Sequence, residues 1–431
     1  MLIRRATLLD GTRVDIRTAE RIRDVADSLV PERGETVLDA AGATVIPGLH
    51  DHHVHVHAAA AALGSVRVGP ADVGDRDRLL RALRSATPGE DGWIRAVGYH
   101  EAVAGPLDRA LLDTLRPDVP VRVQHRSGVL WTLNSAGLTR LGLSGHPDGR
   151  LRSADAGWGA ELERRQVPLG EFSRALARRG VTGITDATPD LDVTTVGDWS
   201  GEIAQRLHVL APGKRILHDD ALDLDELVAW MKDRHDGGTP VAVHCVTAAQ
   251  LVVTIAALRI AGAQPGDRIE HAAVVPDDCI PDLVELGVTV VTQPNFVAER
   301  GDQYRADVPA PEHRELWRVG SLLKAHVRVA FSTDTPFGDG DPWAAMRAAV
   351  HRRTPSGAPL GTTERVDAAT ALALFCGSAD SPTTPRAVAP GEPGDLCIVE
   401  GSPDEVLAEL DGDRVRATIV GGEPVWAPGR E

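Results

Sequence analysis

Lysine, tyrosine and cysteine are scarce in this chain of 431 residues. Lysine occurs only at Lys214, Lys232 and Lys324, so arginine carries almost all of the positive charge. Acidic residues outnumber basic ones, 62 to 46, which gives a formal net charge of -16. Binding to nucleic acid needs clustered Lys and Arg against the phosphates, so we expect no nucleic-acid partner. Solubility alone accounts for an acidic surface.

The four cysteines are widely spaced, and they form no CxxC pair. Their spacing therefore indicates neither a zinc ribbon nor a redox motif. Free thiols are the rule in the cytosol, so we expect a cytoplasmic protein. The N-terminal stretch MLIRRATLLDG has no long apolar core and no small-residue cleavage site, so we expect no signal peptide.

Long hydrophobic runs and glycine-rich phosphate loops are also missing. The most apolar stretch, residues 241–263, is interrupted by His244, Gln250 and Arg259. A membrane-spanning helix needs about 20 consecutive apolar residues, so we expect no contact with a membrane. No GxGxxG motif occurs, which argues against a doubly wound dinucleotide-binding fold. The apolar content of 42% is nevertheless enough for a sizeable core.

Both ends of the chain have the texture of short strands and turns. Residues 1–46 include LIRRATLLDG and ETVLDAAGATVI, and the C-terminal end includes GDLCIVEGS and RVRATIVGGEPVW. Short, partly alternating segments that end in Gly or Asp-Gly are typical of strands. We predict one small β domain, built from residues 1–47 and 385–431, with a barrel domain of residues 48–384 inserted between them.

In the middle of the chain, apolar strand-like segments alternate with helical ones. The predicted strands lie at 180–187, 240–246, 267–275, 288–294 and 327–336. Such alternation is typical of a parallel sheet, and over this length it favours a (β/α)8 barrel. Residues 58–170 fit this pattern less well, because a stretch around 137–160 is rich in Gly, Asp and Pro. An insertion around 58–170 is therefore left open.

The stretch VIPGLHDHHVHVH, residues 45–57, contains five histidines. In a strand, His53, His55 and His57 share one face with Asp51, because side chains alternate between the two faces. His53 and His55 are then close enough to bind one metal ion through their imidazoles. The alternative is an exposed His-rich loop with incidental affinity for metals.

Further polar residues lie at the ends of other predicted strands. These residues are His244 in VAVHC, His271 in RIEHA and Asp334 in AFSTD. The carboxyl ends of barrel strands converge on one mouth, where active sites lie. A lone histidine of this kind is usually a satisfied core residue, but several such residues at matching strand ends predict a metal site.

At this point the sequence resembles a known family. VIPGLHDHHVH is similar to the first-strand signature of the amidohydrolase superfamily, PGxxDxHxH, and the order His, His, Asp follows it. DGWIRAVGYHE, LNSAGL, GVTGITDATP, GDRIEHA, GVTVVTQP and ERVDAATALALF resemble motifs of the family 3 branch, which includes N-substituted formamide deformylases. The resemblance covers nearly the whole chain. It implies an α/β protein: a distorted (β/α)8 TIM barrel with a small β-sandwich domain built from both termini.

The resemblance also implies a set of metal ligands. His53, His55 and Asp334 would bind the more buried metal ion, and His244 and His271 would bind a second one. Lys214, in APGKRILHDD, would be the carboxylated lysine that bridges the two ions. The alternatives are that Lys214 is a surface loop lysine and that the site holds a single metal. The cofactor is a divalent metal, with zinc as the first choice and iron or manganese left open.

The chemistry implied is attack by metal-activated water on a carbonyl carbon. Asp334 would be the catalytic residue, because it can take a proton from water and pass it to the leaving nitrogen. We expect His50, His52 and His57 to be packing or supporting residues. Asp51 is expected to orient the strand or a ligand.

The small-molecule substrate is less well determined. Arg126, Gln293 and Arg300 are candidate substrate-binding residues, and either arginine could grip a carboxylate. A structural or surface role is the alternative for both arginines. Relatives often carry a Gly-His pair where this chain has Gly128-Val129, so a polar contact to substrate is missing there.

Three kinds of function follow. The first is hydrolysis of a linear amide or formamide-like C–N bond. The second is deamination at a single metal ion, or opening of a cyclic amide or lactone. The third, a non-enzymatic barrel scaffold, is disfavoured because the complete ligand set would serve no purpose. The sequence does not specify the oligomeric state, and a homo-oligomer is compatible with it.

Overall fold

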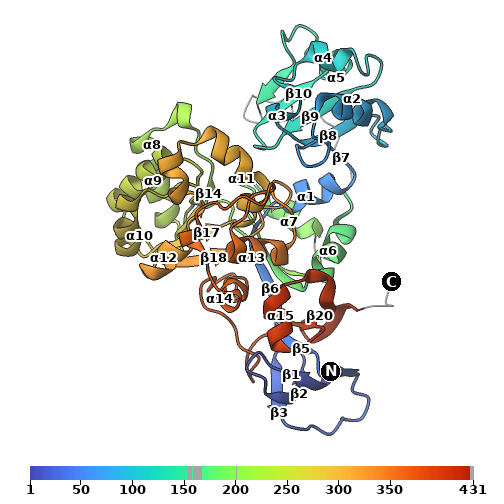
Figure 1. Ribbon diagram of the computed structural model, residues 1–431, viewed down its shortest axis with the longest axis vertical. Helices are drawn as coiled ribbons and strands as arrows, with labels where there is room; N and C mark the ends of the chain where they lie inside the picture. Colours follow the sequence, from blue (N-terminus) through green and yellow to red (C-terminus); the bar gives the residue numbers. More distant parts are fainter. Residues whose placement is uncertain (153–157, 159–166, 200, 428–431) are drawn as a thin grey trace. The chain divides into compact units, whose positions relative to one another are not determined.

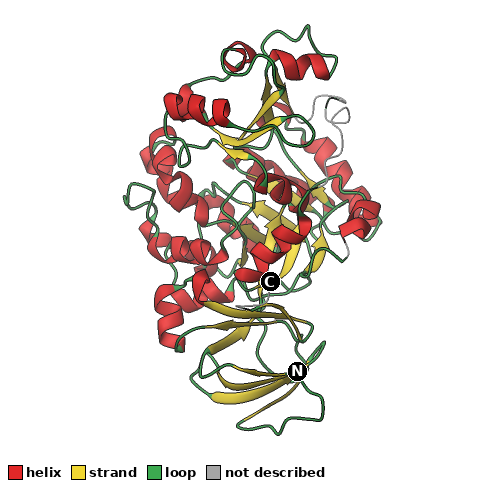
Figure 2. Cartoon of the chain, turned by 90° about the vertical axis from the view of Figure 1, so that its right-hand side faces the viewer, coloured by secondary structure: helices red, strands yellow, loops and turns green. Residues whose placement is uncertain are grey.

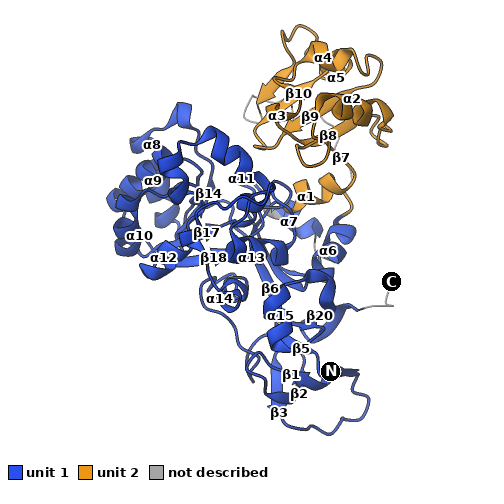
Figure 3. Cartoon of the chain, viewed as in Figure 1, with its two compact units in different colours: residues 1–55, 169–431 blue, residues 56–168 orange. Residues whose placement is uncertain are grey.

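The structure is a computed structural model that describes residues 1–152, 158, 167–199 and 201–427. The chain forms two compact units, which we describe one at a time (Figure 3). Unit 1 contains Met1–His55 and Leu169–Glu431, and unit 2 contains Val56–Pro168.

Unit 1 includes an eight-stranded sheet to which both ends of the chain contribute. Its order is β21-β20-β19-β5-β1-β2-β3, and β4 pairs with β1. Figure 2 shows strands of this sheet beside the N-terminus. The two ends meet where β19 runs antiparallel to β5, with Leu396 opposite Pro47. The strands are β1 Leu2–Thr7, β2 Arg13–Thr18, β3 Ile22–Ala26, β4 Val37–Asp39, β5 Thr44–Pro47, β19 Leu396–Val399, β20 Val415–Val420 and β21 Glu423–Trp426.

One hydrophobic core joins the strands from both ends. Ile3, Ile16 and Val45 come from the N-terminal part, and Ile398 and Ile419 come from the C-terminal part. All five are buried. Burying a side chain of this size contributes about 1.5–3 kcal/mol, so the two ends of the chain stabilise each other. The predicted β-sandwich built from both termini is thereby confirmed.

The rest of unit 1 is built around eight parallel strands in two sheets. The first sheet has the order β13-β12-β6, and the second has the order β14-β15-β16-β17-β18. The second sheet approaches β6 just after β18, where the Asp334 N–H donates to the His53 carbonyl at 3.0 Å. The strands are β6 Leu49–Val54, β12 Val181–Asp186, β13 Arg206–Val209, β14 Lys214–Arg215, β15 Ala242–Cys245, β16 Arg268–His271, β17 Thr289–Thr292 and β18 Arg328–Phe331.

This arrangement is the predicted distorted barrel. Five of its strands, β12 and β15 to β18, lie within the five segments predicted as strands. Every residue of β6, β12, β16 and β17 is buried, as expected for parallel strands covered on both faces. The carboxyl ends of these strands therefore bring polar side chains into a dry interior.

Helices alternate with the barrel strands, and Figure 1 shows α8, α9 and α10 side by side. Side-chain caps stabilise the first turns of several helices. The Asp223 side chain accepts the Glu226 N–H at the start of α8, and the Thr247 side chain accepts the Gln250 N–H at the start of α9. No helix in the described ranges is long and apolar enough to cross a membrane. The helices of unit 1 are α6 Leu169–Arg178, α7 Val193–Trp199, α8 Leu224–Asp236, α9 Ala248–Ala261, α10 Ile280–Leu286, α11 Asn295–Asp307, α12 Gly320–Lys324, α13 Pro342–His351, α14 Ala368–Ala373 and α15 Pro403–Glu409.

Unit 2 has its own sheet, in the order β11-β10-β9-β8-β7, and its own core. The strands β7, β8 and β9 are parallel, and β10 and β11 are antiparallel additions. Its limits lie close to the interval 58–170 in which the sequence left an insertion open; residues 153–157 and 159–166 lie outside the described residues. Its elements are α1 Val56–Leu63, β7 Val66–Arg67, α2 Arg76–Ser85, β8 Ile94–Tyr99, α3 Glu101–Ala104, α4 Arg109–Asp113, β9 Val121–His125, β10 Leu130–Leu133, α5 Ser135–Arg140 and β11 Arg150–Arg152.

Candidate metal centre

The centre begins with three residues at neighbouring strand ends. His53 lies in β6, His55 follows it, and Asp334 lies in the loop after β18. Asp334 Oδ1 is 3.5 Å from Nε2 of His53 and 3.4 Å from Nε2 of His55. Two tetrahedral ligands with bonds of about 2.1 Å lie about 3.4 Å apart, so this spacing suits ligands of one ion.

Several buried polar atoms at this centre have no hydrogen-bond partner among the described residues. They are Nε2 of His53, Oδ1 of Asp334 and Nζ of Lys214. A buried polar atom without a partner is costly, and an ion at the site is one way to satisfy it. The donor set of imidazole, carboxylate and amine therefore fits a divalent transition metal.

Two further histidines extend the centre along β15 and β16. The ring centroids are 5.3 Å apart for His53 and His55, 4.7 Å for His53 and His271, and 4.6 Å for His271 and His244. All four histidines proposed from the sequence as ligands thus lie in one row of rings. Their roles as ligands remain predictions.

Burial keeps the imidazoles of His53, His244 and His271 neutral. The pKa of His244 falls to about 3, first because of burial and then because of the nearby Lys214. The pKa values of His53 and His271 also lie well below the ordinary 6.5, and burial is again the largest cause. Neutral imidazole is the form that binds a metal ion, so the rings are prepared for coordination.

Lys214 is the first residue of β14 and is only 4% exposed. The alternative of a surface loop lysine is therefore wrong. Burial lowers the pKa of its amine to about 8, although Glu270 and Asp334 act to raise it. Lys214 contributes to the lowered pKa values of His53, His244 and His271, which indicates that it belongs to the same centre.

The ligand rings are held by oxygen atoms on the side away from the centre. Nδ1 of His53 contacts the Glu270 carboxylate, and Nδ1 of His271 lies 2.8 Å from Oε1 of Gln293. Both oxygens can only accept, so each Nδ1 carries the proton and leaves the lone pair on Nε2. Such support orients a metal-binding histidine and fixes its tautomer.

Gln293 uses both ends of its amide in contacts within the protein, and substrate binding by this residue remains a prediction. The sequence suggested a contact to substrate, but the side chain is completely buried. Its amide nitrogen donates to Oγ of Ser332 at 2.8 Å while its oxygen faces His271. Both ends of the amide are used within the protein, so the observed role of Gln293 is to hold His271.

Sequence reasoning missed Glu270 and Arg268, which stand two residues apart in β16. Arg268 Nε donates to Glu270 Oε1 at 2.7 Å, and another guanidinium N–H donates to the His52 carbonyl at 2.7 Å. The pair balances its own charge in the barrel interior. The available signal was the segment DRIEHA, in which two charged residues stand inside a segment predicted to be a buried strand.

Asp51 holds the loop that carries Asp334. Its carboxylate accepts the Thr333 N–H at 3.0 Å and the Thr333 hydroxyl at 2.5 Å. Burial raises the pKa of Asp51 to about 7. The orienting role expected from the sequence agrees with these contacts.

The neighbouring histidines of β6 make contacts of a different kind. His50 and His52 stack on each other with centroids 4.5 Å apart, and His50 Nε2 lies 2.9 Å from the Thr185 hydroxyl. His57 belongs to α1 at the start of unit 2 and is exposed.

Two residues of the centre have a backbone conformation that is rare outside glycine. The φ angles of His271 and Asp334 are 71° and 59°. Left-handed backbone at non-glycine residues costs of order 1–3 kcal/mol and is concentrated at functional sites. His271 ends β16 and Asp334 lies in the loop after β18, and both side chains are buried. The strained backbone is found at the two positions that carry proposed metal ligands.

The two candidate arginines lie in different units. In unit 1, Arg300 donates to the Phe337 carbonyl and lies over the Phe296 ring at 4.1 Å from its centroid. Phe337 in turn packs its ring 5.1 Å from that of His55. Arg126 follows β9 in unit 2. Substrate binding by either arginine remains a prediction.

A parallel barrel with histidines and an aspartate at its strand ends defines the class as a metal-dependent hydrolase. The model of the amidohydrolase family matches residues 36–188 and 177–426. The chain therefore belongs to the amidohydrolase family, in its family 3 branch.

Curated relatives are distant. The chain is 26% identical to the N-substituted formamide deformylase of Arthrobacter pascens over 86% of this chain and 84% of the relative. It is 22% identical to Protein LONG AFTER FAR-RED 3 of Arabidopsis thaliana over 91% of this chain and 84% of that protein.

Solved structures share the fold. An uncharacterized metal-dependent hydrolase from Pyrococcus horikoshii matches with a TM-score of 0.75 and 18% identity, over 93% of this chain and 97% of the other. A similar hydrolase from Pyrococcus furiosus matches with a TM-score of 0.70 and 19% identity, over 93% and 99%. An atrazine chlorohydrolase from Arthrobacter aurescens, complexed with zinc, matches with a TM-score of 0.53 and 14% identity, over 100% and 96%.

Proposed function

We propose that this protein hydrolyses a C–N bond of a small amide or formamide-like substrate at a divalent metal centre. The observation that carries the proposal is that three buried atoms, Nε2 of His53, Oδ1 of Asp334 and Nζ of Lys214, have no hydrogen-bond partner among the described residues. Membership of the amidohydrolase family and the 26% identity to a formamide deformylase support this bond type.

The first ion would be held by His53, His55 and Asp334. A second ion would be held by His244 and His271, with Lys214 between the two. When bound, such an ion lowers the pKa of water to about 7 and polarises a carbonyl oxygen. We favour zinc because imidazole and carboxylate suit it, and because a structural neighbour is complexed with zinc.

Lys214 would become a ligand by reacting with carbon dioxide. Its neutral amine adds to the carbon atom, one N–C bond forms, and one proton is released, which leaves a carbamate with two oxygen atoms. The pKa of about 8 supports this step, because a substantial share of the amine is then neutral near physiological pH. An ordinary lysine with a pKa near 10.4 would be almost fully protonated.

Asp334 would move the proton. Its carboxylate would accept a proton from the attacking water and deliver it to the leaving nitrogen as the C–N bond breaks. Its position supports this role, since its N–H is fixed to the His53 carbonyl and the adjacent Thr333 is fixed to Asp51. The carboxylate therefore needs no rearrangement to face the centre.

A second candidate is deamination at a single metal ion. One observation favours it: at this centre, among the described residues, only His53, His55 and Asp334 have ligand atoms that all lie within 4.8 Å of one another. His244 and His271 would then support the single ion or the substrate. The number of bound ions separates the two candidates.

The test is a substrate panel on tag-free protein whose metal content has been measured. The panel contains N-formyl amines, N-acetyl amines, cyclic amides and aminopyrimidines, with D334N as the inactive control. We expect release of amine from N-formyl or N-acetyl substrates. Ammonia release from the aminopyrimidines alone would overturn the proposal in favour of deamination.

A further inference from the structure

Unit 2 carries a group of possible metal ligands of its own. His100 and Glu101 follow β8, and His125 ends β9. The two strands are parallel, and Tyr99 lies opposite His125 in the register. The residues after Tyr99 therefore lie beside the carboxyl end of β9, which is the edge of a parallel sheet where ligands commonly bind.

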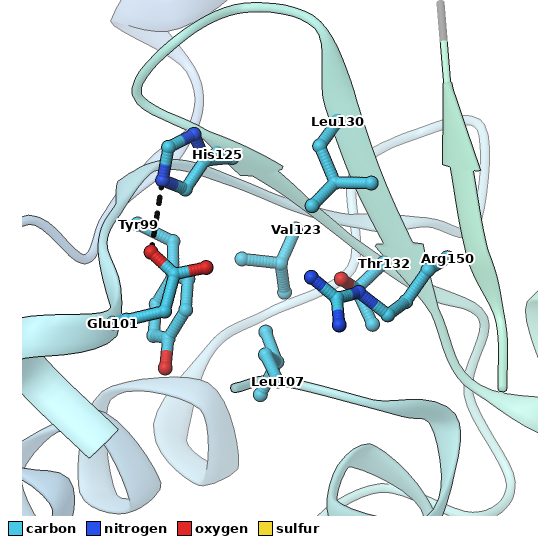
Figure 4. A pocket seen from close by; sticks show the side chains of 8 residues that line it. All are labelled: Tyr99, Glu101, Leu107, Val123, His125, Leu130, Thr132 and Arg150. Atoms are coloured by element: carbon cyan, nitrogen blue, oxygen red, sulfur yellow. Dashed lines mark hydrogen bonds and ion pairs between the residues drawn. The ribbon is translucent and has the colours of Figure 1, made fainter. Parts of the chain in front are cut away.

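The spacing of these side chains suits one ion. The ligand atoms of His100, Glu101 and His125 all lie within 4.8 Å of one another. His125 Nε2 is 3.1 Å from Glu101 Oε2, as the dashed line in Figure 4 shows. Neighbouring ligands on a metal with bonds of about 2.1 Å lie about 3–3.4 Å apart, so this pair needs little movement to bind one.

His125 and Glu101 already make polar contacts, and a bound ion would replace the one between them. The Ser127 N–H donates to Nδ1 of His125 at 3.1 Å, so the ring proton lies on Nε2 and faces Glu101 Oε2 at 3.1 Å. An ion that binds Nε2 moves this proton to Nδ1, where the Ser127 hydroxyl, 2.8 Å away, can accept it. Burial alone would raise the pKa of Glu101, but its own backbone and His125 outweigh this effect and lower it. Glu101 is therefore a carboxylate at neutral pH.

The hollow beside the pair does not suit an organic ligand. Glu101 and His125 share its lining with Leu107, Leu130 and Arg150 (Figure 4). It leaves no room for even a water molecule at its centre. The side chains of His125 and Glu101 are 19% and 39% exposed, so a small ion can reach them from solvent.

We propose that His100, Glu101 and His125 form a binding site for a divalent transition-metal ion on unit 2. Two imidazoles and one carboxylate are a ligand set that zinc uses in proteins. His100 is the third ligand, and its Nδ1 also accepts a backbone N–H, that of Ala102 at 3.2 Å. Binding through Nε2 moves the ring proton to Nδ1 and ends that hydrogen bond.

The test compares zinc bound per chain in four full-length, tag-free proteins: wild type, E101Q/H125Q, H100Q and H146Q. Each is dialysed against buffered free Zn²⁺, and zinc is measured by elemental analysis. His146 is the matched control, because it is another unit 2 histidine beside a carboxylate, Asp148 at 3.4 Å. The unit 1 centre is intact in all four, so its zinc cancels in the comparison.

We expect wild type and H146Q to bind about one zinc ion more than E101Q/H125Q, and H100Q to bind that ion about tenfold more weakly. Circular dichroism verifies folding, and the single variants E101Q and H125Q replace the double variant if it does not fold. Equal zinc content in wild type and the folded unit 2 variants, up to millimolar free zinc, would overturn the proposal.

Discussion

The carboxylate of Glu270 contacts Nδ1 of His53, and both side chains are almost completely shielded from solvent. Nε of Arg268 lies 2.7 Å from Oε1, the other oxygen of the same carboxylate. The contact fixes the proton of His53 on Nδ1 and turns Nε2 towards Asp334. One buried carboxylate thus determines both the orientation and the tautomer of a proposed metal ligand.

Replacing Glu270 should therefore weaken metal binding without removing a ligand. E270Q keeps the size of the side chain but loses its charge, and we expect about a 10–100-fold loss of zinc affinity. Competition with a chelating dye measures this loss. E364Q is the matched control, because Glu364 is also fully buried beside an arginine but lies against Ser321 and Arg318. If both variants lose zinc affinity equally, Glu270 has no special role.

Replacing Asp334 should affect the chemical step more than folding. In D334N the amide cannot take a proton from water, and we expect kcat to fall by about 10²–10⁴. Steady-state kinetics on the best substrate of the panel measures this effect. D341N replaces another buried aspartate, one that caps α13, and should retain its turnover. A D334N enzyme within a few-fold of wild type would exclude the proposed proton transfer.

Lys214 should carry a carbamate that can be seen directly. The chain has only three lysines, so ¹³C NMR after growth with ¹³C-bicarbonate should show one carbamate signal. The signal should vanish in K214R and persist in K324R, since Lys324 is exposed. A spectrum without the signal, from protein that holds one ion in unit 1, would instead favour the single-metal site.

The metal-free chain should lose stability in acid. The pKa of His244 is about 3 in the folded state and 6.5 ordinarily, so the unfolded chain binds a proton more readily between these values. The contribution of His244 is complete above pH 6.5 and is lost as the pH falls towards 3. Thermal melts in chelator should show a falling Tm over this range.

The variant H244Q should flatten that pH dependence, because the residue that takes up the proton is gone. H351Q, which replaces an exposed histidine, should follow wild type. Identical slopes for H244Q and wild type would show that the acid sensitivity arises elsewhere.

The sequence predicted the barrel and the row of histidines because both depend on local pattern. Buried strands with a polar residue at their carboxyl ends can be recognised from segments such as VAVHC and RIEHA. The roles of Gln293 and Glu270 could not be predicted in this way. Each is defined by a contact across strands, to His271 and His53, which no spacing along the chain reveals.

The pairing of strands in unit 2 could not be predicted from the sequence either. Its strands β8 and β9 lie in segments that the sequence marked as strands, DGWIRAVGYHE and DVPVRVQHRSG. Their pairing places His125 beside Glu101. The group of possible ligands there follows from that register, because the residues are about 24 positions apart in the chain.

The most direct test of the account is the metal content of H55Q beside that of H57Q. The two histidines are two residues apart in VHVH, but only His55 lies 3.4 Å from Asp334 Oδ1. We expect H55Q to lose about one zinc ion per chain and its amidohydrolase activity, and H57Q to keep both. Equal metal content in wild type and both variants would contradict a metal centre at His53, His55 and Asp334.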